Sequence, residues 1–221
     1  MSRSRFNLRK ARLAQMMIAA RVVEEDVLPP RVELVGGVDV AYVGGRMVAA
    51  AVLLNVHDLK PVSKANVVLE VRFPYIPTLL AFREAGPAIL AVQKLTTPPH
   101  LLFVDGNGRL HPFLAGLACQ VGLALNLPTI GVAKKLLCGS IGEWRGDRAP
   151  VTLKGRVVGM ALSMGRRMRP IYVSVGHRIS LETAVRFTKR MTRRGSKLPE
   201  PLRLAHLEAT AISRQLRLGS S

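Results

Sequence analysis

Cysteine, aromatic residues and long apolar runs are scarce in this sequence of 221 residues. Its two cysteines, Cys119 and Cys138, form no CxxC pair and stand apart from any histidine cluster, which argues against a zinc module, an iron–sulfur site or a disulfide scaffold. We therefore expect a reducing, cytoplasmic environment. The longest apolar run, residues 47–56, is too short to cross a bilayer, and aromatic residues make up only 5% of the chain, so we expect no contact with a membrane.

The N-terminal segment is basic but lacks the pattern of a signal peptide. The apolar stretch at 13–23 is short, is interrupted by Arg21 and is followed by acidic residues at 24–26. Such a stretch is more typical of an amphipathic helix.

Negative charge is scarce as well. Lys and Arg total 33 against 14 Asp and Glu, which gives a formal net charge of +19. Because hydrophobic residues make up 48% of the chain, it can bury enough surface to fold, and the excess positive charge then lies on a folded surface. We expect a single, monomeric domain over residues 1–221 with a polyanionic partner such as nucleic acid.

The spacing of apolar residues predicts a mixed α/β domain. Three strands joined by tight turns come first and form an antiparallel meander; helices and strands follow, with two helices at the end, which indicates a mixed sheet flanked by helices. Gly86 and Pro87 are expected to bend or split the first helix after the meander. The expected strands cover residues 34–43, 47–56, 65–73, 101–106, 129–134, 157–164 and 171–177, and the expected helices 13–23, 78–95, 113–127, 180–191 and 201–218.

Two aspartates occupy unusual positions in these strands. Asp39 is flanked by valines inside the first strand, where an uncompensated carboxylate is costly to bury, and Asp105 ends an apolar strand and opens the loop DGNG. The predicted order of elements brings the first strand beside the fourth, and these two carboxylates together would then suit Mg²⁺ or Mn²⁺. The alternative for each is a salt bridge to one of the many arginines.

Glu84 is a third candidate acid. On a helix it shares a face with Leu80 and Ala81 and so can point at the sheet, although on spacing alone an exposed glutamate paired with Arg83 or a neighbour fits slightly better. A two-metal phosphodiester hydrolase needs several carboxylates around its cations, and Asp39, Glu84 and Asp105 could supply them.

The segment PYIP, formed by Pro74, Tyr75, Ile76 and Pro77, separates a strand from a helix. Two prolines hold it stiff, which favours a rigid exposed wedge of the kind that unstacks nucleic-acid bases. The alternative is a helix-start turn with Tyr75 packed in the core.

Other basic groups lie near these positions. His111 closely follows DGNG and could reach a phosphate or cap the next helix, and Lys134 ends a strand where its ammonium could hold a phosphate. The arginine-rich stretches at 165–169 and 188–197 favour contacts with a nucleic-acid backbone.

Signals for other enzyme classes are weak. The segment ALSMG at 161–165 lacks the first glycine of a nucleophile elbow, and Ser174 is near His177 only in sequence. The chain has no P-loop, and DGNG lacks the last glycine of a dinucleotide-binding fingerprint.

Taken together, several motifs resemble the endonuclease V family, which acts on deaminated adenine. The matching segments, spread over residues 30–210, are GVDVAY, PYIP with LAFRE, FVDGNGRLHP, LPTIGVAKK, VSVGHRISLETA and LPEPLRLAH. The resemblance implies a ribonuclease H-like fold. It also implies a Mg²⁺-dependent repair enzyme that cuts DNA at the second phosphodiester bond 3′ to deoxyinosine, leaving a 3′-hydroxyl and a 5′-phosphate.

The same resemblance implies roles for individual residues. Asp39, Glu84 and Asp105 would hold the metal, with Mn²⁺ as a possible substitute. His111 would lie beside the attacking water or the phosphate, and Lys134 would hold the phosphate. His206 would be a catalytic histidine near the C-terminus. Tyr75, within the segment Pro74, Tyr75, Ile76 and Pro77, would be the wedge, and Gly106 and Gly108 would form part of the base pocket.

Three positions depart from the pattern of many relatives. Thr78 follows PYIP where glycine is common, Ala85 is inserted before Gly86, and His206 stands where some relatives carry aspartate. Two alternatives stay open: a nuclease of the same fold that acts on inosine in RNA or on a branched structure, and a non-catalytic basic protein that binds nucleic acid.

Overall fold

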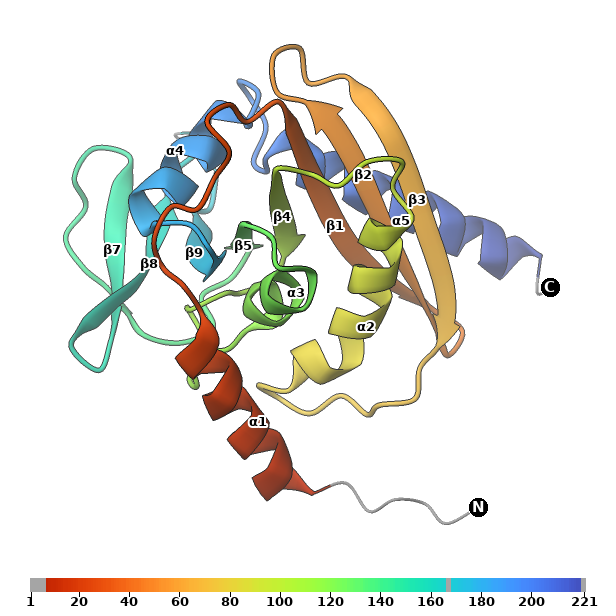
Figure 1. Ribbon diagram of the computed structural model, residues 1–221, viewed down its shortest axis with the longest axis horizontal. Helices are drawn as coiled ribbons and strands as arrows, with labels where there is room; N and C mark the ends of the chain where they lie inside the picture. The colour runs from red at the N-terminus through yellow and green to blue at the C-terminus, as the bar shows by residue number, and fades with distance from the viewer. Residues whose placement is uncertain (1–6, 166–167, 220–221) are drawn as a thin grey trace.

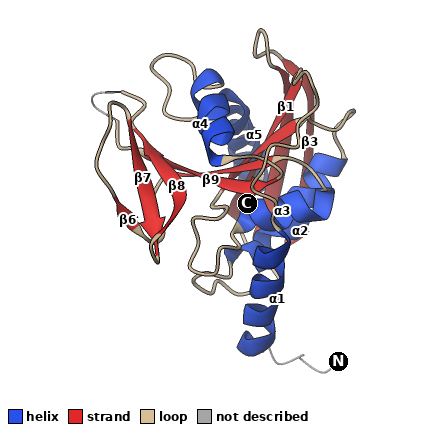
Figure 2. Cartoon of the chain, turned by 60° about the vertical axis from the view of Figure 1, so that its left-hand side comes forward, coloured by secondary structure: helices blue, strands red, loops and turns tan. Residues whose placement is uncertain are grey.

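The structure is a computed structural model that describes residues 7–165 and 168–219. Its centre is one mixed sheet whose strands lie in the order β3-β2-β1-β4-β5-β9-β8-β7-β6 (Figures 1 and 2). The strands are β1 (Leu34–Val43), β2 (Arg46–Asn55), β3 (Pro61–Glu70), β4 (Leu101–Asp105), β5 (Thr129–Ala133), β6 (Ser140–Ile141), β7 (Arg148–Leu153), β8 (Arg156–Leu162) and β9 (Ile171–His177). The helices are α1 (Leu8–Arg21), α2 (Leu80–Gln93), α3 (Leu117–Leu125), α4 (Leu181–Arg190) and α5 (Glu200–Leu218).

Strand β1 is central to the architecture. It pairs antiparallel with β2 and parallel with β4, which confirms the expected meander and the expected neighbourhood of the first and fourth strands. The mixed α/β sheet with flanking helices agrees with the expected ribonuclease H-like class.

Helices cover both faces of the sheet. In Figure 1, α2 lies in front of β1 to β3 and α5 behind them. Side chains alternate along each strand, so neighbouring residues of β4 enter different cores: Leu101 and Phe103 pack with Leu202 of α5, and Leu102 packs with Ala88 of α2. Burying a side chain of this size stabilises the fold by about 1.5–3 kcal/mol.

Some predicted elements differ from the structure. Helix α2 passes through Pro87 without being split, because the proline removes only the hydrogen bond to the turn before it and the apolar face of the helix stays packed on the sheet. Strand β3 starts at Pro61, four residues before the expected position at Ala65, because its exposed polar residues hid the alternation.

The segment 139–150, which none of the expected strands and helices covers, contains β6 and the first residues of β7. This hairpin was missed because its glycines and arginines resemble a turn, whereas β7 is held by pairing with β8. Of the stretch 165–169, residues 166 and 167 lie outside the described residues. Among the helices in the described part of the chain, none is both long and apolar enough to cross a membrane.

Candidate active site

The pairing of β1 with β4 brings the predicted aspartates together. The parallel register pairs Val38 of β1 with Val104 of β4, so the next residues, Asp39 and Asp105, are neighbours where this pairing stops, at the carboxyl end of β4 and four residues before the end of β1. This is the edge at which open α/β sheets bind ligands. Both side chains follow the face of the sheet that α5 covers, because Val35 and Phe103, an even number of residues earlier, pack there.

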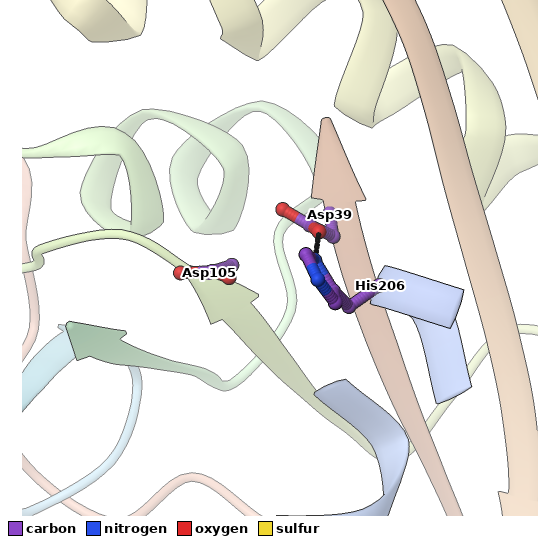
Figure 3. A group of neighbouring side chains, drawn as sticks. All are labelled: Asp39, Asp105 and His206. Atoms are coloured by element: carbon purple, nitrogen blue, oxygen red, sulfur yellow. Dashed lines mark hydrogen bonds and ion pairs between the residues drawn. The ribbon is translucent and has the colours of Figure 1, made fainter. Parts of the chain in front are cut away.

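Helix α5 adds His206 to this pair. Its Nδ1 lies 2.7 Å from Asp39 Oδ2, and its side chain is about half exposed, at 49%. The other oxygen of Asp39 accepts a hydrogen bond from the amide of Val40 at 2.8 Å. Figure 3 shows the imidazole reaching from α5 to the end of β1, with Asp105 facing the same space.

The three side chains form a compact set of donors. One ligand atom from each of Asp39, Asp105 and His206 can be chosen so that all lie within 4.8 Å of one another. Two carboxylates and an imidazole are ligands suited to a hard or borderline divalent cation. Of the metal-binding residues expected from the sequence, this set contains Asp39 and Asp105 but not Glu84, and its third member is His206, which was expected as a catalytic residue.

Glu84 of α2 is buried, with an exposed fraction of 6%, so it does not lie on the exposed face that was the alternative for it. Tyr42 donates a hydrogen bond from its hydroxyl to Glu84 Oε1 at 2.6 Å, and the guanidinium of Arg83 lies 4.4 Å from the centre of the Tyr42 ring. The pKa of Glu84 is raised to about 7, chiefly by burial and also by the charges of Asp39 and Asp105, against the opposing effect of the Tyr42 hydrogen bond.

Tyr42 was not predicted as part of the site. The segment DVAY offered a signal, since a tyrosine three residues after a catalytic candidate on the same strand can place its hydroxyl near the site. Its pKa is raised by burial and by Glu84, so the hydroxyl remains a donor.

Lys134, at the end of β5, lies beside Asp105. Its ammonium is 2.6 Å from Asp105 Oδ2, and its side chain is 40% exposed. Burial and the charge of Asp39 raise the pKa of Asp105, while Lys134 acts in the opposite direction. Carboxyl groups with raised pKa values, here Glu84 and Asp105, are the electrostatic condition that a bound cation relieves, so these residues fit a divalent metal.

The loop DGNG is shaped by close packing. A Cβ on Gly108 would lie 2.0 Å from the carbonyl oxygen of Val175, and the amide of Gly108 donates to Ser174 Oγ at 2.9 Å. Gly106 has φ +155°, which favours glycine. The loop is therefore seated against β9 and turns sharply after Asp105.

His111 makes contacts different from those expected of a group beside water or phosphate. It is 4% exposed, its Nδ1 accepts a hydrogen bond from the amide of Phe113 at 3.2 Å, and its Nε2 lies 3.1 Å from the carbonyl oxygen of Thr78. Nδ1 acts as an acceptor, so Nε2 carries the proton and donates to Thr78. The pKa of His111 is lowered to about 4, chiefly by burial and also by the charge of Arg12.

The segment PYIP lies between β3 and α2 and is exposed at its tip. Tyr75 is 68% exposed, so it is not packed in the core as the alternative required. Thr78, directly after the segment, has φ +68°, a left-handed conformation that favours glycine. Thr78 therefore places a β-branched side chain where the backbone favours glycine.

Ser174 and His177 have structural contacts. Ser174 is buried and accepts the amide of Gly108, and His177 Nδ1 accepts the amide of Val23 at 3.2 Å. These contacts agree with the rejection of a serine hydrolase. In the stretch 188–197, Lys189 pairs with Asp147 and Arg193 with Glu200.

Known proteins resemble this chain over nearly its whole length. The family model described as Endonuclease V matches residues 16–207. An Endonuclease V from Thermofilum pendens is 53% identical over 209 residues, covering 95% of this chain and 90% of the relative.

Solved structures agree. A crystal structure of the Endonuclease V from Streptomyces avermitilis has a TM-score of 0.86 and 38% identity, covering 97% of this chain and 95% of that one. An Endonuclease V from Ciona intestinalis has a TM-score of 0.85 and 26% identity over 98% of this chain and 100% of that one, and was solved with a 23-nucleotide DNA containing an inosine followed by a ribo-adenosine.

Proposed function

This chain belongs to the endonuclease V family and is therefore a nuclease, a phosphodiester hydrolase, and we propose that it recognises deoxyinosine in DNA and cuts the strand nearby with the help of Mg²⁺. The observation that carries the proposal is the grouping of Asp39, Asp105 and His206 within 4.8 Å at the ends of β1 and β4. The inosine-containing DNA bound by the Ciona intestinalis relative supports the choice of base.

Asp39 and Asp105 are proposed to hold the cation, Mg²⁺ or Mn²⁺, with Glu84 as the third acidic group, since the charges of both aspartates act on it. His206 lies within reach of the same cation and orients Asp39 through their 2.7 Å contact. Such a cation supplies charge stabilisation at the phosphate and lowers the pKa of water. Tyr42 fixes the carboxylate of Glu84 through its hydrogen bond. Lys134, beside Asp105 and partly exposed, holds a phosphate oxygen.

The proposed reaction is hydrolysis at the second phosphodiester bond 3′ to the inosine. Water attacks the phosphorus, the bond from phosphorus to the 3′ oxygen breaks, and the products are a 3′-hydroxyl and a 5′-phosphate. His111 supports this reaction indirectly, because both of its ring nitrogens already hold the backbone of Phe113 and Thr78.

The proposed base pocket is formed by the wedge and the loop DGNG. Tyr75 would take the place of the extruded base, and the backbone at Gly106 and Gly108 would approach the hypoxanthine. Asn107 Oδ1, between them, is buried without a hydrogen-bond partner among the described residues. An acceptor there suits the N1–H of hypoxanthine and rejects adenine, whose N1 is itself an acceptor.

A second candidate is cleavage of inosine-containing RNA. The DNA in the Ciona intestinalis complex carries a ribo-adenosine directly after the inosine, so a related site accommodates a ribonucleotide there. Cleavage of matched DNA and RNA strands that differ only in the sugar would decide between the two.

The test is to incubate the protein with a labelled duplex that contains one inosine, with Mg²⁺ or with a chelator, and to map the nick. We expect one nick at the second bond, none with chelator and none with adenine in place of inosine. Asp39→Asn and Asp105→Asn keep side-chain size and should lower the rate at least about a hundredfold while binding persists.

Asp58→Asn is the matched control, because Asp58 is an exposed acid in the turn between β2 and β3. It should cut at the normal rate. Cutting by Asp105→Asn at the wild-type rate, or cutting that survives the chelator, would contradict the metal assignment.

A further inference from the structure

The residue after the wedge, Thr78, has an energetically unfavourable backbone. A β-branched side chain at φ +68° is rare, because the Cβ crowds the backbone in the left-handed region. Such a conformation persists only where its surroundings hold it. The groups that contact Thr78 therefore decide how PYIP leaves β3 and enters α2.

Helix α1 supplies most of those contacts. Gln15 donates from Nε2 to the carbonyl oxygen of Thr78 at 2.7 Å, and Arg12 donates from Nη1 to Thr78 Oγ1 at 2.8 Å. The same Arg12 nitrogen donates to Gln15 Oε1 at 2.8 Å, and His111 adds its contact to the Thr78 carbonyl. Both the backbone and the side chain of Thr78 are thus held from residues distant in sequence.

The burial pattern of α1 indicates what the helix is for. Of its residues, all of which are described, only Ala11 and Gln15 are buried, whereas Leu13 and Met16 are 52% and 60% exposed. Gln15 is fully buried, and both ends of its amide are used in the contacts with Arg12 and Thr78. Helix α1 exposes apolar residues and buries the amide of Gln15. This pattern indicates that the helix positions its neighbour Thr78 more than it contributes to an apolar core.

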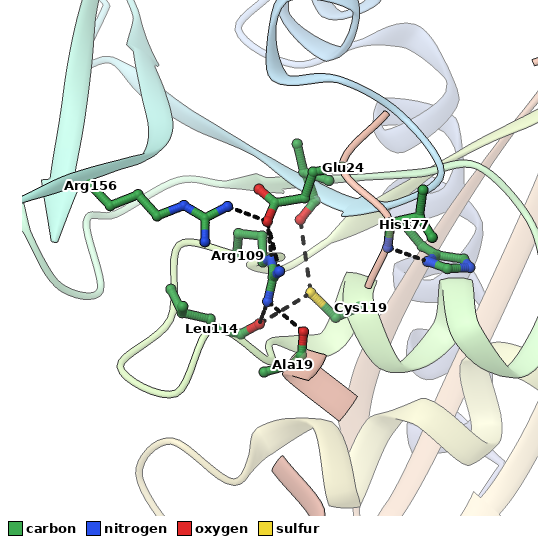
Figure 4. A network of polar contacts seen from close by, with 9 residues as sticks. Ala19, Glu24, Arg109, Leu114, Cys119, Arg156 and His177 are labelled. Carbon is green, nitrogen blue, oxygen red and sulfur yellow. Dashed lines mark hydrogen bonds and ion pairs between the residues drawn. The ribbon is translucent and has the colours of Figure 1, made fainter. Parts of the chain in front are cut away.

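The other end of α1 is tied to the loop that follows Asp105. Arg109 donates to the carbonyl oxygens of Ala19 at 2.9 Å and Leu114 at 3.2 Å, and its guanidinium pairs with Glu24 at 2.6 Å (Figure 4). The side chain of Arg109 is 9% exposed, so these contacts are well shielded from water. Helix α1 therefore contacts both the loop that follows Asp105 and the residue that follows PYIP.

We propose that Arg12 and Gln15 are positioning residues. They hold Thr78, and through it the wedge residue Tyr75, in a fixed position beside the loop DGNG. This inference rests on the proposed function, because it needs the wedge to extrude a base. It assigns α1 a role in the discrimination of a damaged base within a duplex. Extrusion from a duplex requires unstacking and unpairing, whereas a single strand requires much less, so the two substrates separate this role from a general one.

The decisive variant is Gln15→Met, which keeps the volume of the side chain and removes both of its hydrogen bonds. We expect kcat/KM on an inosine duplex to fall about fivefold, which corresponds to the net free energy of one hydrogen bond, because only the bond from Gln15 to Thr78 acts on the wedge. On the single strand we expect a change of less than about twofold. Arg12→Gln should act in the same direction. Arg9→Gln is its control, because Arg9 is an exposed residue of the same helix and its replacement removes the same charge.

A double-mutant cycle tests whether Gln15 acts through the wedge. In a Tyr75→Ala background, Gln15→Met should cause no further change in the ratio of duplex to single-strand cleavage. Equal losses on both substrates, or additive losses in the cycle, would overturn the inference and leave α1 a stabilising helix.

Amide hydrogen exchange separates this inference from the proposed function. In Gln15→Met the amides of Thr78 and Leu79 should exchange faster than in the wild type and in Arg9→Gln, whether or not the protein cuts inosine. Unchanged exchange would refute the positioning role. A wild-type protein that cuts no inosine strand, or a Tyr75→Ala variant with an unaltered duplex to single-strand ratio, would refute the proposed nuclease specificity or the wedge instead.

Discussion

Buried polar side chains gather around the carboxyl ends of β1 and β4. Glu84, His111 and Gln15 are 6%, 4% and 0% exposed, and each is held by a specific partner: Tyr42 for Glu84, and the backbone of Thr78 for the other two. Polar groups are costly to bury without such partners. Because burying these groups costs stability, their concentration in one region indicates that this region is a functional site.

His111 should make the stability of the protein depend on pH. Its pKa is lowered to about 4 by burial, compared with 6.5 for the free side chain. The unfolded chain therefore binds a proton at this residue before the folded one does, and stability is complete above pH 6.5 and falls as the pH decreases toward 4. The difference amounts to about 3 kcal/mol in the free energy of unfolding.

Denaturant unfolding of wild type and His111→Gln between pH 7.5 and pH 4 measures this effect. The variant should lose less stability over that range, because Gln does not titrate. His177, whose pKa burial also lowers, remains in both proteins and cancels in the comparison. Parallel stability curves for the two proteins would show that His111 is not buried in its neutral form.

At the scale of elements, the site depends on how closely α5 approaches β1. A Cβ on Gly37 would lie 2.2 Å from the carbonyl oxygen of Pro201, in the first turn of α5. Both contacting groups are backbone, so neither can give way by changing rotamer. Gly37 therefore sets the distance between β1, which carries Asp39, and α5, which carries His206.

Gly37→Ala should displace α5 and separate His206 from Asp39. We expect a loss of about 1–3 kcal/mol in the free energy of unfolding, as for overpacking elsewhere, and a fall in cleavage larger than the loss of folded protein explains. Urea unfolding combined with cleavage at saturating Mg²⁺ measures both quantities. Normal activity in this variant would mean that the position of His206 is unimportant.

Gly86→Ala is the matched control for that change. Gly86 lies inside α2, and apart from its two chain neighbours and the backbone of its own helix no described atom lies within 4 Å of a Cβ built there. The same substitution should therefore increase stability by about 0.5–1 kcal/mol, since alanine favours the helix. Destabilisation by Gly86→Ala would show that α2 is strained beside Pro87.

At the scale of the whole molecule, the dominant feature is its charge of +19. Such an excess attracts any nucleic acid and releases counterions when it binds. If about six phosphates are neutralised, affinity for undamaged DNA should fall about a thousandfold between about 50 and 200 mM salt. Binding measured by fluorescence anisotropy in the presence of a chelator gives this slope without cleavage.

The exposed Arg194, within the basic stretch 188–197, allows the assignment of that stretch to be tested. Arg194→Gln should reduce the salt slope by about one if the side chain contacts a phosphate. An unchanged slope would place the bound strand elsewhere on the molecule.

Much of the fold could be predicted from local patterns. The apolar stretches in 34–43 and 101–106 identified β1 and β4, and turn residues separated the strands of the meander. The hairpin of β6 and β7 could not be predicted, because its pairing with β8 holds a sequence that by itself favours a turn. The contact of Tyr42 with Glu84 also depends on long-range packing, since the two residues come from a strand and a helix separated by two further strands.

The sequence alone determined which groups are available: scarce carboxylates on apolar strands, a stiff PYIP segment and a large positive charge. These follow from composition and short-range periodicity, which are properties of neighbouring residues. Only the tertiary structure decided that Asp39 and Asp105 are neighbours in register and that Gln15 and Arg12 hold Thr78. It also decided that His111 contacts the carbonyl oxygen of Thr78. Each of these depends on contacts between residues 33 or more positions apart or on a parallel register, neither of which is encoded in any local stretch of the chain.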